Sequence, residues 1–313
     1  GHLRHLQRSA QTLVSAWLRF LRIRLVPTVI SNVLAGVVLS GGQLDSQAWI
    51  ILLTWSISLY LFGMALNDLV DRNRDLTRTD ETGTPVRPIP AGLISVRSGL
   101  VVLCLLFIPN LWIFDLGESL AATTTVAAVL LYNLVLKEIP ILGPLVMGLA
   151  RTGLICTAAD TAGGLENALP HAISIGILTT AITLFSQEEE RARPQALLIR
   201  FWLCLLMAVV TPQLIWQIAN GDWEPNLQLF LYSAGIGLYV YWAGHPGPGR
   251  CPDLCTFRLL TTLPLLDIYH TSAYLSLSLF ENLFLLTIWL LWVKIVTPSE
   301  KTQEIETEKG SDQ

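Results

Sequence analysis

The run SQAWIILLTWSISLYLFGMALN, residues 46–67, contains no charged residue and is long enough to cross a bilayer as one helix. It ends in the segment NDLVDRNRD, residues 67–75, where three aspartates and two arginines stand close together. The simplest interpretation is a membrane helix whose polar chemistry is concentrated at its end.

The composition of the whole chain supports this interpretation. Of 313 residues, 52% are hydrophobic and 14% are charged, and the mean hydropathy is +0.53, which does not fit an ordinary soluble domain. The net charge is −4, and most of it comes from residues 299–313, so the sequence offers no basic surface for nucleic acid. The cysteines form no disulfide pattern, because only Cys251 and Cys255 are neighbours, and these favour a plain loop.

Nine apolar runs are long enough for spanning helices, which predicts an all-α polytopic membrane protein. They cover residues 17–40, 46–67, 97–114, 118–136, 141–162, 168–186, 198–219, 226–244 and 272–296.

The connecting segments alternate in charge. Lys and Arg gather before the first run and in the second, fourth, sixth and eighth loops, whereas the first, third, fifth and seventh loops contain neither. Since positive charge accumulates on the cytoplasmic side, we expect the N-terminus and the functional site to be cytoplasmic.

We expect one transmembrane domain over residues 1–298. Residues 257–269, in the eighth loop, predict a short apolar helix that is re-entrant or lies at the membrane interface. The acidic tail, residues 299–313, is expected to be disordered because it is almost devoid of apolar residues.

The aspartates predict a metal site. Asp68, Asp71 and Asp75 stand at i, i+3 and i+7, so on a continuing helix their carboxylates fall within about 60° of one another. Like charges on one stripe repel, and Mg²⁺ commonly bridges one or two carboxylates to substrate phosphates. The alternative is a solvated, salt-bridged helix end. Arginines interleave with these acids and can contact phosphate oxygens: Arg72, Arg74 and Arg78.

A second acidic group begins the sixth loop, on the same predicted side. Glu188, Glu189 and Glu190 follow Gln187 and precede Arg191. Consecutive acids point in different directions on a helix, so one or two of them at most can face the first cluster. A solvated charge run is the alternative.

The chain resembles the UbiA superfamily of intramembrane prenyltransferases, and the resemblance extends over the sequence up to about residue 296. The resemblance is carried by Asn67-Asp68-x-x-Asp71-x-x-x-Asp75 and by the continuation RPIPAGLIS, residues 87–95. Further similar elements are Pro27-Thr28 with NVLAG at residues 32–36, Tyr132-x-x-x-x-Lys137, Gly143-Pro144-Leu145, MGLAR at residues 147–151, and Leu266-Asp267.

The resemblance implies nine helices around a central cavity and a polyprenyl diphosphate held through Mg²⁺ between two acidic sites. It assigns the metal to Asp68, Asp71, Asp75, Glu188 and Glu189. It assigns catalysis to the three aspartates with Lys137 and Tyr132, whose ring face can stabilise an allylic cation. The residues expected to bind the diphosphate are Asn67, Arg24, Arg74, Arg78, Arg87, Arg151 and Arg191.

The sequence departs from the family pattern at the second acidic site, where the family usually carries Asp-x-x-x-Asp. Two other observations concern polar residues inside apolar runs. Arg151 is expected on the cavity wall, against the alternatives of snorkelling or pairing with Asp160. His171 and His270 are single histidines without companion ligands, which favours structural roles.

The leading hypothesis is a Mg²⁺-dependent prenyl transfer from a polyprenyl diphosphate to an aromatic or lipid-like acceptor within the bilayer. A terpene cyclase of the same superfamily would ionise the donor without an external acceptor. A non-catalytic carrier or export component for an isoprenoid lipid is the third possibility, although such binding does not need three aspartates.

Overall fold

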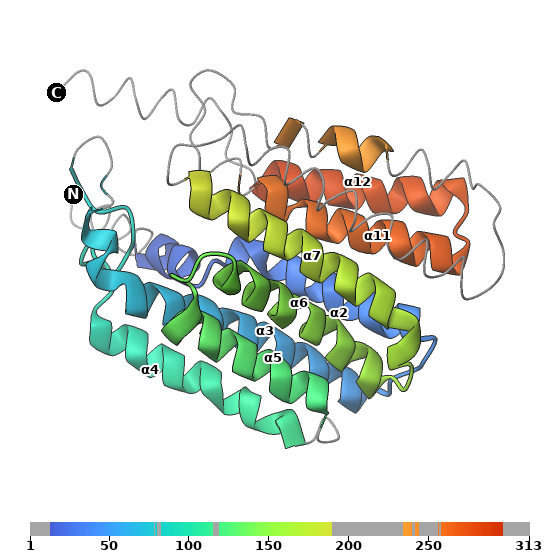
Figure 1. Ribbon diagram of the computed structural model, residues 1–313, viewed down its shortest axis with the longest axis horizontal. Coiled ribbons are helices and arrows are strands. Elements are labelled where there is room, and N and C mark those ends of the chain that lie inside the picture. The colour runs from blue at the N-terminus through green and yellow to red at the C-terminus, as the bar shows by residue number, and fades with distance from the viewer. Residues whose placement is uncertain are drawn as a thin grey trace, which may run out of the picture. The chain divides into compact units, whose positions relative to one another are not determined.

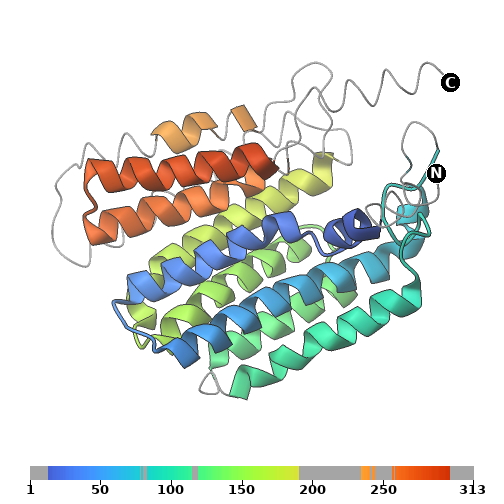
Figure 2. The ribbon, with the colours of Figure 1, turned by 180° about the vertical axis from the view of Figure 1, so that it is seen from behind.

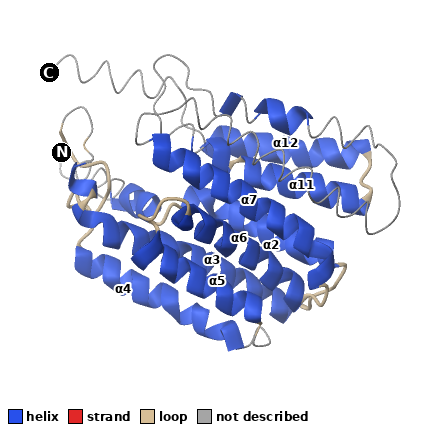
Figure 3. Cartoon of the chain, viewed as in Figure 1, coloured by secondary structure: helices blue, strands red, loops and turns tan. Residues whose placement is uncertain are grey.

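The computed structural model describes residues 13–77, 79, 83–114, 119–189, 234–239, 242–243, 256 and 258–296. Within these ranges the chain is helical, with no strand and one isolated bridge between Thr79 and Pro85 (Figure 3). The predicted all-α class is therefore confirmed.

Among the described residues, four stretches are long and apolar enough to cross a membrane: Ile23–Ser40, Ser46–Asn73, Leu142–Thr161 and Leu165–Gln187. They support an integral membrane protein. The predicted runs 198–219 and most of 226–244 lie outside the described residues, as does the predicted tail. The α-helices, labelled in Figure 1 where they are long, are α2 (Val26–Ser40), α3 (Ser46–Val70), α4 (Val96–Phe107), α5 (Leu120–Leu131), α6 (Leu142–Thr161), α7 (Leu165–Glu189), α11 (Thr262–Leu275) and α12 (Leu279–Val296).

Two of the predicted runs change helix type along their length. After α4 the chain continues as a 3-10 helix, Ile108–Phe114, which includes Pro109. Proline has no N–H to donate, so it cannot continue the α-helical ladder. After α5 the chain continues as a π-helix, Tyr132–Leu136, and this form is frequent at functional sites.

The chain divides into two compact units, and α3 contributes to both. The first contains Gly1–Val26, Thr54–Trp112 and Ser299–Gln313, and the second contains Pro27–Leu53 and Ile113–Pro298. In the first unit α4 lies beside the C-terminal part of α3, as both views show (Figures 1 and 2). Ser58 donates to the carbonyl of Leu106 over 2.5 Å, and the rings of Phe62 and Phe107 lie 5.5 Å apart. The buried core of this unit consists of Ala16, Phe20, Ala65, Leu69, Ile89 and Ile94.

In the second unit α6 and α7 pack closely because glycines stand where they cross. A Cβ added at Gly148 would lie 2.1 Å from Thr180 Oγ1 and 2.4 Å from the Gly176 carbonyl oxygen. A Cβ at Gly176 would in turn lie 2.1 Å from Thr152 Oγ1. Small residues of this kind let membrane helices approach each other to backbone contact.

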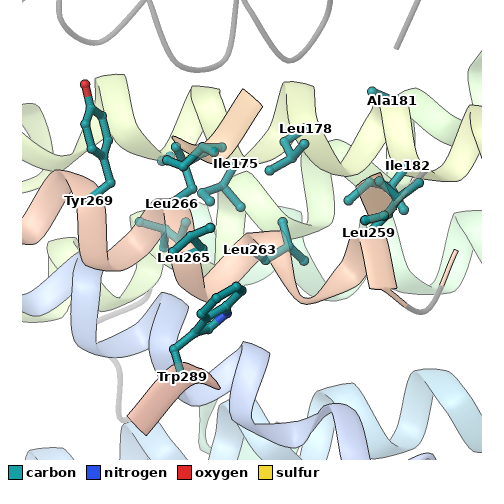
Figure 4. Packing of buried hydrophobic residues seen from close by; sticks show 14 of the residues in the cluster. Ile175, Leu178, Ala181, Ile182, Leu259, Leu263, Leu265, Leu266, Tyr269 and Trp289 are labelled. Carbon is teal, nitrogen blue, oxygen red and sulfur yellow. The ribbon is translucent and has the colours of Figure 1, made fainter. Parts of the chain in front are cut away.

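The apolar core of the second unit lies between α7, α11 and α12 (Figure 4). Ile175 and Leu178 of α7 face Leu263 and Leu266 of α11, and all four are fully buried. Trp289 of α12 enters the same core, where its indole N–H donates to a carbonyl of the segment before α11.

The helix bounds near the C-terminus differ from those expected from the sequence. Helix α11 begins at Thr262, ends at Leu275 and is largely buried in the core of the second unit, and its first eight residues overlap the predicted short helix at 257–269. It stops at Ser276, whose φ of 51° is left-handed. Ser278 and Glu281 then form a reciprocal capping box that starts α12 seven residues later than the predicted span.

Candidate functional site

The acidic segment does not continue α3 as an α-helix, so the predicted continuous stripe is wrong in its geometry. The α-helix ends at Val70, and two 3-10 turns follow, Asp71–Asn73 and Asp75–Thr77. The Arg72 side chain donates to the Leu69 carbonyl over 3.1 Å and satisfies one of the backbone groups that the helix end leaves open.

All three aspartates are nevertheless buried. The exposed fraction is 2% for Asp68, 8% for Asp71 and 2% for Asp75. A solvated helix end, the alternative drawn from the sequence, would leave them in water. A buried carboxylate is costly unless it is paired or binds a metal, so the burial itself indicates that these groups have partners.

Arginines from three parts of the first unit supply those partners. Arg22 contacts Asp68 at 3.1 Å, and Arg87 lies 4.0 Å from Asp68 and 3.9 Å from Asp75. The exposed Arg74 lies 3.7 Å from Asp71. The guanidinium groups offset the negative charge, so crowding of the acids does not by itself require a metal.

The feature that does fit a metal is an oxygen of Asp68. Its Oδ1 contacts the two arginines, whereas Oδ2 is buried and has no hydrogen-bond partner among the described residues. No three His, Cys, Asp or Glu side chains converge as a ligand group in the described part of the chain. Mg²⁺ does not need such a cage, because one or two carboxylates with substrate phosphates and water suffice. The residues present therefore fit Mg²⁺ bound together with a phosphate ligand.

Arg22 is a site residue that the sequence analysis did not single out. Its backbone is left-handed, with φ of 49°, immediately before the 3-10 helix Ile23–Leu25, and Tyr60 donates to its carbonyl over 3.2 Å. From this position the Arg22 guanidinium reaches Asp68 at 3.1 Å. Arg24, which was expected to bind the diphosphate, is exposed.

Arg87 owes its position to the loop that follows it. Pro88 accepts backbone hydrogen bonds from Leu93 and Ile94, and Ile89 and Ile94 are buried in the core of the first unit. The remaining predicted members of this cluster are less constrained. Asn67 is half-buried, and Arg78 lies outside the described residues.

In the second unit the Tyr132–Lys137 element lies against the C-terminal end of α7. Tyr132 opens the π-helix and Lys137 follows it, and both are half-buried. Gln187 of α7 donates to the Lys137 carbonyl over 3.0 Å. Glu188 and Glu189 are the last residues of α7, so the second acidic group follows this contact directly; Arg191 lies outside the described residues.

A second polar cluster, buried among four helices of the same unit, was not expected. Arg151 of α6 donates to Asn32 Oδ1 over 3.0 Å and to Thr28 Oγ1 over 3.1 Å, both on α2. The alternative of pairing with Asp160 is not seen, since Asp160 accepts from Ser119 instead. Arg151 is therefore bound to polar groups inside its unit.

Asp267 of α11 is the centre of this buried cluster. Its Oδ2 accepts from Ser31 over 2.7 Å and from Asn32 over 2.8 Å, and its Oδ1 lies 2.7 Å from His171 Nε2. His171 Nδ1 in turn meets His270 Nδ1 at 2.5 Å. The two histidines, for which the sequence favoured structural roles, are 99 positions apart in the chain and adjacent in the fold.

Helices long and apolar enough to span a membrane indicate an integral membrane protein, and a cluster of acids and arginines is buried in its first unit. The UbiA prenyltransferase family model matches residues 29–246, and the chain belongs to this family. No curated protein matches the sequence.

Solved structures share the fold at low sequence identity. A UbiA homolog from Archaeoglobus fulgidus, bound to DMAPP and Mg²⁺, is 16% identical with a TM-score of 0.54, and the match covers 84% of this chain and 100% of that one. An apo UbiA homolog from Aeropyrum pernix is 15% identical with a TM-score of 0.57, covering 77% and 94%. A digeranylgeranylglyceryl phosphate synthase is 13% identical with a TM-score of 0.56, covering 83% and 98%.

Proposed function

We propose that this protein transfers a prenyl group from a polyprenyl diphosphate to an aromatic or lipid-like acceptor within the membrane, with Mg²⁺ as cofactor. The observation that carries the proposal is the buried cluster of Asp68, Asp71 and Asp75 with Arg22 and Arg87, in which Oδ2 of Asp68 has no hydrogen-bond partner among the described residues. Bound prenyl diphosphate and Mg²⁺ in the Archaeoglobus homolog support it, as does the family.

The chemistry follows from where charge develops. When the allylic C–O bond breaks, its electron pair leaves with the diphosphate, and the acceptor captures the resulting cation and loses a proton. Mg²⁺, when bound, neutralises the diphosphate and makes it a better leaving group. Asp68 would hold the metal, and Arg22 and Arg87 would stabilise the charge that grows on the leaving oxygens.

The remaining assignments stay part of the proposal and rest on the resemblance. Lys137 adds positive charge for the diphosphate, and Tyr132 stabilises the allylic cation through its ring. Asn67, Arg24, Arg74, Arg78, Arg151 and Arg191 are further diphosphate-binding candidates, and Glu188 and Glu189 are candidates for a second metal.

The proposed architecture is that of the superfamily: nine spanning helices around a central cavity, in a single domain over residues 1–298. We place the N-terminus and the acidic cluster on the cytoplasmic side, because the basic residues gather in that set of loops.

The test is product analysis with the purified protein in nanodiscs containing Mg²⁺. Geranyl, farnesyl and geranylgeranyl diphosphate are supplied with and without an extract of membrane lipids, and both diphosphate and organic products are measured. We expect a prenylated product that requires the extract. A hydrocarbon formed without it would show a cyclase, and tight binding without diphosphate release from any donor would show a carrier.

A further inference from the structure

In the polar cluster around Asp267, the chemistry of the side chains fixes which group donates and which accepts each hydrogen bond. Arg151 has only donors, so the Asn32 oxygen faces it and the Asn32 amide nitrogen faces Asp267. A carboxylate only accepts, so His171 Nε2 carries the hydrogen that lies between it and Asp267.

The same rule continues through the histidines. With both rings uncharged, each has one nitrogen that donates and one that accepts. His171 donates through Nε2, so its Nδ1 accepts, and His270 must donate through its own Nδ1. His270 Nε2 is therefore left as a hydrogen-bond acceptor at the end of the chain.

No donor among the described residues reaches this last acceptor, the Nε2 atom of His270. His270 Nε2 is buried and lacks a hydrogen-bond partner among the described residues. The imidazole is held in place, since its ring centroid lies 4.6 Å from that of His171 and 4.9 Å from that of Tyr269. A fixed, buried acceptor without a donor is unfavourable, so the arrangement is completed by a ligand that brings an O–H or N–H group.

We propose that His270 Nε2 binds the hydroxyl group of a membrane-soluble alcohol or phenol, and that Asp267 and His171 position it to accept. Leu263, Leu266 and Tyr269 of the same helix are buried in the apolar core of this unit, so the ligand that we propose is apolar apart from its hydroxyl group. Identifying this ligand as the prenyl acceptor rests on the proposed function. The assignment of His270 Nε2 as a hydrogen-bond acceptor does not depend on it.

Two probes that differ only in their hydroxyl group test the proposed hydrogen bond. 4-Nonylphenol can donate a hydrogen bond, whereas its methyl ether, 4-nonylanisole, cannot. Their affinities are measured by calorimetry with the full chain in nanodiscs, without Mg²⁺ or prenyl diphosphate. Because both probes also partition into lipid, each affinity ratio is compared with that of His270→Phe in identical nanodiscs.

We expect the parent protein to prefer the phenol about tenfold, which is the size of one net hydrogen bond, and His270→Phe to show no preference. Thr271→Val is the matched control. Within the described part of the chain its hydroxyl bonds only to carbonyls of its own helix, Asp267 and Ile268, so the tenfold preference should remain.

Asp267→Asn gives the sharpest test, because it should reverse the direction of the chain. Asn32 still donates, so the new amide turns its oxygen to Asn32 and its NH₂ to His171. His171 Nε2 must then accept, both histidines change tautomer, and His270 Nε2 becomes a donor. The preference for the phenol should fall to about equal affinity with the ether, although no group near Nε2 has changed size.

An equal affinity of the parent for phenol and ether, as a site filled only by water would give, overturns the proposal. An unchanged preference in Asp267→Asn overturns it as well. If that variant does not fold, His171→Phe replaces it and should lower the preference, because the hydrogen on His270 is then shared between its two nitrogens and the phenol must select one tautomer. Diphosphate release is measured on the same parent sample, so failure of the proposed prenyl transfer is recorded separately from failure of the hydroxyl site.

Discussion

Diphosphate release from a prenyl diphosphate is expected to fall about a thousandfold when Asp68 is replaced by asparagine. The substitution keeps the shape of the side chain but removes the charge that faces Arg22 and Arg87, together with the oxygen proposed for Mg²⁺. The measurement is the initial rate of diphosphate release by the variant and the parent at saturating Mg²⁺.

The matched control is Asp45→Asn. Asp45 is exposed and caps the other end of α3 by accepting from the Ala48 N–H over 2.7 Å, a role that asparagine fills equally well. Its rate should equal that of the parent. Thermal unfolding of both variants shows whether each remains folded. A folded Asp68→Asn protein that releases diphosphate at the rate of the parent would contradict the assignment.

The second large effect concerns the crossing of α6 and α7. Gly148→Val should lower the free energy of unfolding by about 3 kcal/mol or more. A Cβ there would lie 2.4 Å from a backbone oxygen of α7, which cannot move without shifting the helix. Since these helices carry Arg151 and His171, the tilt would also disturb the buried polar cluster. Thermal unfolding in detergent measures the loss.

Leu149→Phe is the control for added bulk on α6. Leu149 is adjacent in sequence but 47% exposed, so a larger side chain meets no packed neighbour there. Its unfolding temperature should stay close to that of the parent. Equal stability of the Gly148 and Leu149 variants would mean that the two helices are not in close contact.

Hydropathy and spacing predicted the fold class and the acidic cluster because both depend on neighbours in the sequence. An uncharged run that is long enough to cross a bilayer predicts α3, and the aspartates that follow it are separated by only a few residues. The start of α12 also has a signal in the sequence, because Ser278 and Glu281 have the spacing of a capping box. The apolar pattern continues through this capping box, so hydropathy alone places the start of the helix too early.

The partners of the buried polar groups could not be predicted from the sequence. The choice between Arg22 and Arg24 depends on a left-handed backbone at Arg22, which residue spacing does not reveal. His171 and His270 belong to different apolar runs, and only the packing of α7 against α11 makes them neighbours. Long-range polar contacts inside a helical bundle depend on helix rotation, and a single sequence contains little information about it.

The arginines also change the argument for a metal. Three neighbouring carboxylates in the sequence predict a cation, yet Arg22, Arg74 and Arg87 offset their charge in the structure. Oδ2 of Asp68 has no hydrogen-bond partner among the described residues and can bind Mg²⁺, which predicts weak binding of the metal alone and strong binding together with a diphosphate.

The most direct measurement is therefore the binding of farnesyl thiodiphosphate, an analogue that ionises slowly, to the parent and to Asp68→Asn with and without Mg²⁺. We expect Mg²⁺ to strengthen binding to the parent at least tenfold, in the range of ordinary linkage between two ligands, and to leave binding to the variant unchanged. Binding to the parent that is equally tight in the presence of a chelator would contradict it.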